Sequence, residues 1–237
     1  LDGQKQLEKL ASQNLFLEPL DSEGTWYRYH SLFSELLRFC LQRFHPEKIT
    51  ELHRQASAWF SAEGWFDMAA LHASQAADDT GTAALLERHI NDLWERGEFS
   101  TILRWGKSLP MEILEHRIRL AVYISLALIM TGELREGILR LEEMKRVYGD
   151  EMQGETAGWL AAGFTYAAYS QRDMASMQAH AERALALLPA SSHHWRGGAA
   201  VVLANAKIHE GDFPAAEEVL QQAETSALAS DNRFLLL

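Results

Sequence analysis

The chain has 237 residues, of which 47% are apolar, and a formal net charge of −11 from 33 acidic and 22 basic side chains. This length and apolar content allow a sizeable core, whereas the negative charge disfavours nucleic acid as a direct partner, because it repels the phosphate backbone. The single cysteine, Cys40, excludes an intramolecular disulfide and fits a reducing compartment, so we expect a cytoplasmic protein.

The N-terminal residues predict a helix, a β-hairpin and a second helix. Residues 4–13 have helical spacing, and residues 15–17 and 26–29 are apolar and aromatic runs of the kind that favours strands. Asp, Ser and Gly at residues 21–24 supply the turn between these runs. A helix is expected at residues 31–44, and it ends at His45, because the following Pro46 disfavours helical geometry in the residue before it.

The rest of the chain carries a turn signature that recurs once for each pair of helices. Gly97, Gly132, Arg172 and Gly211 each begin such a turn between two segments with helical apolar spacing, and Gly64 begins a looser copy. Successive turns are 33, 35, 40 and 39 residues apart (64 to 97, 97 to 132, 132 to 172, 172 to 211). A period of this length is typical of a helical solenoid. We therefore predict helices at residues 46–62, 67–78, 82–96, 99–108, 112–131, 134–148, 154–171, 174–188, 193–210 and 213–229.

The later repeats resemble tetratricopeptide units. An apolar residue follows Gly211 by two positions and alanines follow it by five and twelve, although Met144 stands at the last of these positions after Gly132. Small residues are needed there because neighbouring helices approach to about 8 Å. The resemblance runs from about Arg119 to the end and completes the predicted fold class: all-α, a tetratricopeptide-like α–α superhelix preceded by a small winged-helix remnant with a β-hairpin. The most apolar stretch, residues 120–130, is about half as long as a membrane-crossing helix, so no membrane partner is expected.

A more specific resemblance covers roughly residues 7–110. The ordered motifs are YRYHSLFSELLR at residues 27–38, LHRQASAWF at 52–60, AALHA at 69–73, LRW at 103–105 and LP at 109–110. This series resembles the MalT-type large ATP-binding regulators of the LuxR family. In that family an ATPase domain precedes a winged helix, a helical arm, sensor repeats and a C-terminal helix-turn-helix.

The resemblance implies that this chain is the middle of a longer protein. Residues 1–45 would be the C-terminal part of the winged-helix domain, 46–110 the helical arm, and 111–237 the sensor repeats, truncated at their C-terminus. The start at Leu1 and the apolar end at residues 234–237 led us to expect a fragment whose last repeat is covered by another. The whole protein would be a transcription activator that binds ATP or ADP, self-associates, and contacts DNA only through a C-terminal domain absent from this chain.

Catalytic chemistry is not expected in this chain. No Gly-x-x-x-x-Gly-Lys-Ser/Thr sequence is present to cradle a nucleotide phosphate. Histidines, carboxylates and Cys40 form no nucleophilic or metal-binding pattern, and His193-His194 has no third ligand at a suitable spacing. We therefore predict no enzyme activity, no metal and no resident cofactor for the chain itself.

His30 is the one candidate for nucleotide sensing. It stands where ATPases related to the MalT family keep a Met-His-Asp motif, whose histidine contacts the ADP phosphate; Ser31 replaces the acid of that motif. An imidazole at a helix start can donate a hydrogen bond to an anion. The alternative is a helix-entry residue bonded locally.

The register of the repeats gives a candidate effector site. Three aromatic and three polar residues occupy positions that line the groove in tetratricopeptide superhelices, and they could stack on and hydrogen-bond a sugar or an aromatic acid. The alternative is that these aromatic side chains belong to the core. The six residues are Arg119, Trp159, Tyr166, Tyr169, Asn205 and His209.

These observations leave two main functions open. One is a sensor segment of a transcription regulator that binds a small-molecule inducer. The other is a docking solenoid that binds a regulatory protein or peptide in its groove. A groove with apolar walls and a few convergent polar groups favours the inducer, and an open charged channel favours the protein partner.

Overall fold

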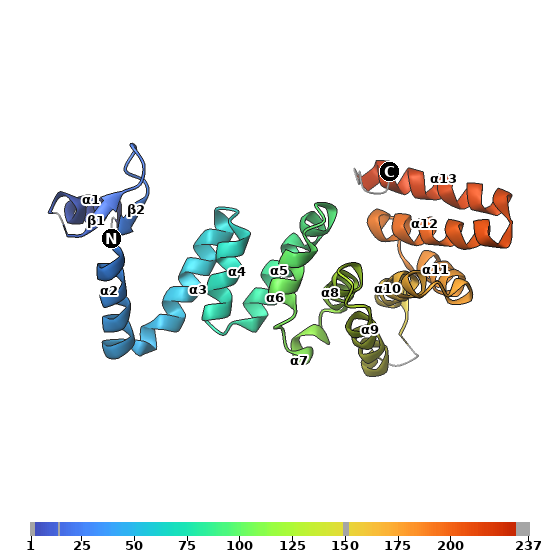
Figure 1. Ribbon diagram of the computed structural model, residues 1–237, viewed down its shortest axis with the longest axis horizontal. Coiled ribbons are helices and arrows are strands. Elements are labelled where there is room, and N and C mark those ends of the chain that lie inside the picture. The colour runs from blue at the N-terminus through green and yellow to red at the C-terminus, as the bar shows by residue number, and fades with distance from the viewer. Residues whose placement is uncertain (1–2, 14, 149–151, 231–237) are drawn as a thin grey trace.

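The structure is a row of antiparallel helix pairs that begins with a small unit of two helices and a hairpin (Figure 1). It is a computed structural model that describes residues 3–13, 15–148 and 152–230. The predicted fold class, an all-α solenoid preceded by a β-hairpin, is confirmed. The apolar run at residues 234–237, for which we expected cover from a further repeat, lies outside the described residues. The elements are α1 (Gly3–Ser12), β1 (Leu17–Pro19), β2 (Tyr27–Tyr29), α2 (Ser31–Phe44), α3 (Pro46–Ala62), α4 (Phe66–Gln75), α5 (Asp79–Glu95), α6 (Phe99–Gly106), α7 (Met111–Leu114), α8 (Ile118–Met130), α9 (Leu134–Tyr148), α10 (Gly154–Gln171), α11 (Met174–Leu187), α12 (His193–Glu210) and α13 (Phe213–Ser230).

The hairpin is short and contacts the first helix pair through Trp26, which follows its turn. Strands β1 and β2 are antiparallel, with Leu17 opposite Tyr29. The carboxylate of Asp21 accepts a hydrogen bond from the backbone N–H of Thr25 at 2.8 Å and thereby closes the turn. Beyond it, the Trp26 indole stacks on Trp65, with ring centroids 5.2 Å apart. The aromatic residue that favoured a strand in the sequence thus also joins the hairpin to the α3–α4 pair.

All five predicted turns have the same backbone geometry. Gly64, Gly97, Gly132 and Gly211 have φ between 69° and 92°, and Arg172 has φ 58°. In each turn the next residue donates its N–H to the carbonyl five positions earlier, at 2.8–3.0 Å. These are helix ends of the Schellman type, in which a left-handed residue lets the chain reverse while the last carbonyls stay bonded. The sequence signature therefore marks a repeated helix stop.

The predicted helix at residues 112–131 is two helices, α7 and α8, so the prediction of one helix was wrong. The break follows from contacts with other helices. The hydroxyl of Tyr148, at the end of α9, donates to the carbonyl of Glu115, and Arg117 forms an ion pair with Glu87 of α5. Arg117 has φ −138° and ψ 57°, which is not helical. Local apolar spacing could not reveal these contacts.

Helix α8 is the centre of the core. Eleven of its thirteen residues are buried, because α6, α9 and α10 pack around it. Gly137 of α9 lies so close that an added Cβ would be 2.6 Å from the carbonyl oxygen of Ser125. Although α8 is strongly apolar, no helix in the described ranges has both the length and the apolarity to cross a bilayer.

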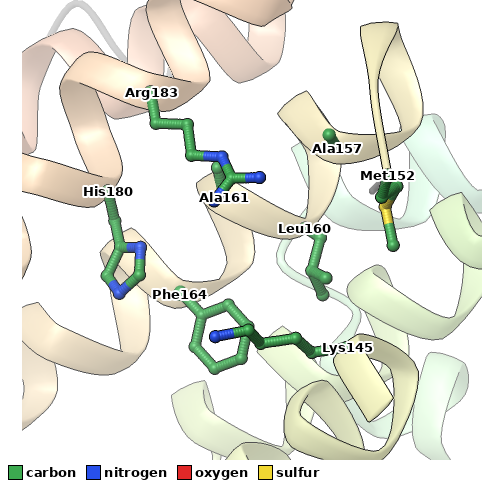
Figure 2. A pocket seen from close by; sticks show the side chains of 8 residues that line it. All are labelled: Lys145, Met152, Ala157, Leu160, Ala161, Phe164, His180 and Arg183. Atoms are coloured by element: carbon green, nitrogen blue, oxygen red, sulfur yellow. The ribbon is translucent and has the colours of Figure 1, made fainter. Parts of the chain in front are cut away.

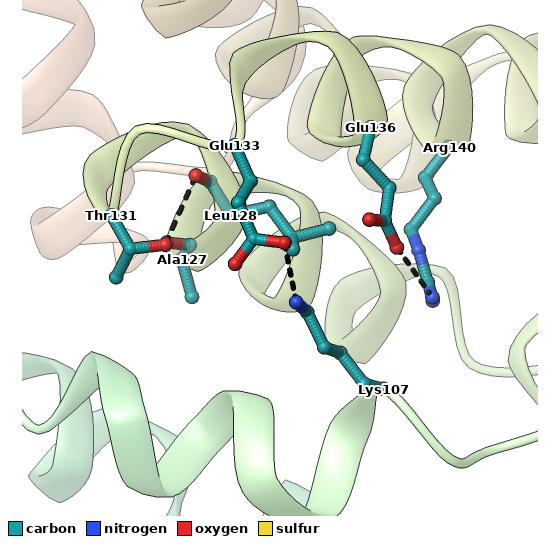
Figure 3. A network of polar contacts seen from close by, with 7 residues as sticks. All are labelled: Lys107, Ala127, Leu128, Thr131, Glu133, Glu136 and Arg140. Carbon is teal, nitrogen blue, oxygen red and sulfur yellow. Dashed lines mark hydrogen bonds and ion pairs between the residues drawn. The ribbon is translucent and has the colours of Figure 1, made fainter.

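Polar contacts fix the exit from α8 (Figure 3). The Thr131 hydroxyl donates to carbonyls of the last turn of α8 at 2.9 and 3.1 Å. Lys107, just after α6, pairs with Glu133 at 2.5 Å, and Glu136 pairs with Arg140 along α9 at 3.3 Å. The Lys107–Glu133 pair thereby connects α6 to the turn between α8 and α9.

Candidate ligand-binding hollow

A hollow of about 390 Å³ opens where α5, α8, α10 and the start of α12 meet. This volume lies within the range of small-molecule sites. Four helices that are far apart in the sequence contribute to it, so it exists only because the superhelix brings their ends together. The lining residues are Asn91, Glu95, Arg119, Tyr123, Glu155, Trp159, Ser191, Ser192, His193, His194 and Trp195.

Aromatic rings form one wall of the hollow. The centroids of Tyr123 and Trp195 are 4.6 Å apart, and Trp94, which does not line the hollow, packs on Tyr123 with centroids 5.4 Å apart. His194 stacks on Tyr123 at 6.3 Å. The Tyr123 ring is fully buried, and its hydroxyl donates to Asn91 Oδ1 at 2.8 Å. Packing thus holds this wall rigid.

Arg119 is held in place beside that wall. Its guanidinium donates to Asn91 Oδ1 at 2.6 Å and lies 5.8 Å from the centroid of Tyr123. Burial, and secondarily the positive charge of Arg119, lowers the pKa of His194 to about 4. The His194 imidazole is therefore neutral at pH 7, so it has one donor and one acceptor nitrogen.

Two carboxylates share the lining with Arg119. Glu95 and Glu155 line the same hollow, and Glu155 accepts a hydrogen bond from the Ser192 hydroxyl at 3.0 Å. Burial raises the pKa of Tyr123 well above its ordinary value, so the phenol also stays neutral. The hollow thus combines donors and acceptors with flat aromatic surfaces, which suits a neutral polar ligand better than an ion.

The structure brings two of the six predicted effector residues together. Arg119 and Trp159 both line the hollow. Tyr166 packs between two core clusters, and burial raises its pKa to about 12. Outside the lining of this hollow lie the exposed residues Tyr169, Asn205 and His209.

Sequence reasoning missed most of the wall. Asn91 and Tyr123 lie on helices that carried no polar or aromatic pattern pointing to a site, and only the structure places them beside Arg119. The pair His193-His194 before Trp195 had no third ligand for a metal and carried no other pattern typical of a site. The signal available in the sequence was this run of imidazole and aromatic side chains at a helix start. Among the described residues, no three His, Cys, Asp or Glu side chains lie together as a metal site requires.

His30 lies at the start of α2 and is not among the residues that line this hollow. Its backbone N–H donates to the carbonyl of Phe16 at 2.7 Å, and its own carbonyl accepts from Ser34 N–H at 2.9 Å. The side chain is exposed and makes no capping hydrogen bond. The backbone of His30 is therefore bonded locally, whereas the imidazole is not used to cap the helix.

Comparison with known proteins finds relatives among MalT transcriptional regulators and in one kind of protein kinase. The model of the MalT winged helix domain matches residues 1–49. The chain is 29% identical over 234 residues to the HTH-type transcriptional regulator MalT of Cronobacter sakazakii, and 26% identical over 230 residues to MalT of Klebsiella pneumoniae. It is also 33% identical over 129 residues to the serine/threonine-protein kinase PknK of Mycobacterium tuberculosis.

The extent of these matches differs between the relatives. The kinase match covers 54% of this chain and 12% of the kinase, whereas each MalT match covers 97% of this chain and 26% of the regulator. The predicted resemblance is confirmed: over nearly its whole length the chain is similar to the MalT-type transcriptional regulators, and it spans about a quarter of their length.

Proposed function

We propose that this chain is the effector-sensing segment of a MalT-like transcriptional regulator and that the hollow beside Arg119 binds a small polar inducer. The observation that carries the proposal is the composition of the hollow. Two indoles and a phenol stand beside a guanidinium, two carboxylates, two serines and a neutral imidazole. This is the kind of groove, with aromatic walls and convergent polar groups, that favours a small ligand over a peptide.

A polyhydroxylated ligand fits this chemistry. Sugar hydroxyls both donate and accept hydrogen bonds, so they can satisfy Arg119 on one side and Glu155 on the other. The apolar face of a sugar ring can stack on an indole such as Trp159. An anionic ligand would face the carboxylates of Glu95 and Glu155, and a cationic ligand would face the Arg119 guanidinium, so either would lose hydration without full compensation.

Binding there would add a further connection between helix pairs that packing and a few polar contacts already join. The hollow takes residues from α5, α8, α10 and α12, so one ligand bridges successive turns of the superhelix. A ligand shifts a conformational equilibrium only if it binds one state better. We propose that it favours the curvature in which these four helices converge, and that this state permits self-association, nucleotide exchange and DNA binding by parts of the protein outside this chain.

The relatives support an input role for the segment. Similar segments occur in an HTH-type transcriptional regulator and in a serine/threonine-protein kinase, whose named activities differ. A segment shared by proteins with different activities is better explained as a sensor than as the part that carries out either activity. The division into a winged helix (1–45), an arm (46–110) and sensor repeats (111–237) remains a prediction within this proposal.

A thermal-shift screen of sugars and aromatic acids tests the proposed site. At a ligand concentration one hundred times Kd, binding stabilises the native state by about 2.7 kcal/mol, which raises Tm by about 5–11 °C for a chain of this size. Trp159→Ala should abolish the shift, because Trp159 lines the hollow. Tyr169→Ala is the matched control, because Tyr169 is exposed and outside the lining.

Two results would reject the inducer site. One is equal loss of the shift in both variants. The other is the absence of any shift across the screen together with saturable binding of a partner peptide, which would support the docking function instead.

For nucleotide sensing we propose that the exposed His30 imidazole contacts the ADP phosphate in the full-length protein. His30→Ala should then speed ADP release, whereas His45→Ala, which changes an exposed histidine at the other end of α2, should not. Unchanged ADP retention in His30→Ala would leave His30 as a helix-entry residue.

A further inference from the structure

A second, smaller hollow lies between α9, α10 and α11 (Figure 2). Its volume is about 40 Å³, enough for about three waters at roughly 10–15 Å³ each. It shares no lining residue with the hollow beside Arg119. We name it the Lys145–Arg183 hollow, and it is lined by Lys145, Met152, Ala157, Leu160, Ala161, Phe164, His180 and Arg183.

Among the residues that the structure describes, the polar part of this lining is entirely basic. Lys145 comes from α9, and His180 and Arg183 come from α11, one turn apart. In Figure 2 the side chains of Arg183, His180 and Lys145 surround Phe164 and Ala161. No ion pair joins Lys145 or Arg183 to a carboxylate within residues 3–13, 15–148 and 152–230.

The pKa of His180 responds to burial and to these positive charges. Burial lowers the pKa of His180, and the charges of Lys145 and Arg183 lower it further, whereas Asp173 acts weakly in the opposite direction. An anion placed between the two cations would remove the repulsion that they exert on the imidazolium. The hollow is therefore complementary to negative charge.

The remainder of the lining is apolar. The Phe164 ring stacks on His180 with centroids 5.3 Å apart and an interplanar angle of 24°. Leu160 and Ala161 of α10 are buried, with 6% and 4% of their surface exposed. A small ligand would thus meet both cationic and hydrocarbon side chains.

We propose that the Lys145–Arg183 hollow binds a small organic carboxylate, with the carboxylate between the two cations and a short hydrocarbon chain against Leu160 and Phe164. Hydrogen bonds between a carboxylate and two basic side chains are charge-assisted and about twice as strong as neutral ones. By the same measure the hollow encloses about three non-hydrogen atoms, so the carboxylate group fits inside it and the hydrocarbon chain lies along its opening. Such a ligand connects α9 to α11, which belong to successive helix pairs, and so provides a second input independent of the inducer.

Butyrate and its neutral counterpart butyramide test the proposal. Titration of the chain with butyrate, followed through the His180 imidazole proton resonances in NMR spectra, should give a saturable shift that butyramide does not give. The resonances are assigned with His180→Gln. The double variant Lys145→Gln/Arg183→Gln should bind butyrate at least tenfold more weakly, because both cations are lost.

A charge-matched control separates the site from the net charge. Arg135→Gln/Arg146→Gln removes two basic groups from α9, which also carries Lys145, and leaves the lining intact. Its butyrate affinity should equal that of the unmodified chain. Trp159→Ala should also bind butyrate normally, so failure of the inducer site and failure of this site are distinguishable.

Three outcomes would overturn the proposal. Equal binding of butyrate and butyramide would show that the cations are not used. Equal loss of affinity in both double variants would show a nonspecific charge effect. Binding of inorganic phosphate as tight as that of butyrate would show that the apolar lining contributes nothing.

Discussion

Replacing Arg172 with glycine should stabilise the protein, although it removes a long side chain. Arg172 occupies the left-handed position of its turn, with φ 58° and ψ 31°, where the four corresponding turns have glycine. Its side chain is exposed and makes no hydrogen bond or ion pair with any residue that the structure describes. The substitution therefore changes the backbone preference and little else.

The size of the effect follows from two opposing contributions. A residue with a Cβ pays about 1–2 kcal/mol for left-handed geometry. Glycine in turn destabilises the folded chain by about 0.4–1 kcal/mol, because it increases the conformational entropy of the unfolded chain. The net gain should be about 0.5–1 kcal/mol, or about 1–4 °C in Tm for a chain of this length.

Urea denaturation and amide hydrogen exchange measure this gain. Repeats of a solenoid can open separately, so exchange at the amide of Asp173, which bonds the carbonyl of Ala168 at 3.0 Å, reports on the turn itself. Gly211→Ala is the matched opposite change at φ 81° and should lose about 0.5–1 kcal/mol by the same two contributions. A less stable Arg172→Gly, or a more stable Gly211→Ala, would refute the reasoning.

Three further predictions concern packing and pH. Gly198→Ala places a Cβ 2.1 Å from the Tyr166 hydroxyl and should lower the free energy of unfolding by about 1–3 kcal/mol. Adding Tyr166→Phe should recover most of this loss, and the absence of any recovery would contradict the contact. The pKa of His194 is about 4 in the folded chain and about 6.5 in the unfolded chain. Its contribution to the free energy of unfolding is therefore complete above pH 6.5 and falls by up to about 3 kcal/mol as the pH drops to 4. His194→Gln should flatten that part of the curve of unfolding free energy, measured with urea, against pH. Trp26→Ala removes the stack on Trp65 and should make the hairpin more sensitive to limited proteolysis while the later repeats stay resistant; unchanged cleavage would show that the stack does not hold the hairpin.

The candidate site was only partly predictable, for an identifiable reason. The repeat register selected residues on the first helix of each pair, and it treated Trp159, Tyr166 and Tyr169 alike. In the structure these three residues of α10 line a hollow, pack in the core and face solvent, respectively. Their fates differ because each faces a different neighbour, and the identity of that neighbour depends on the curvature of the whole superhelix.

The sequence by itself determined the repeated local structure. Each helix stop requires a left-handed residue and a hydrogen bond between residues five positions apart, so residues close in the chain encode it. The hairpin and the motifs that resemble MalT-type regulators are likewise local.

Only the tertiary structure decided the break between α7 and α8, the meeting of Asn91 with Arg119, and the burial that keeps His194 neutral. These features depend on contacts between side chains roughly 30 to 100 positions apart, and such contacts are set by how neighbouring helix pairs pack rather than by the preference of any one segment.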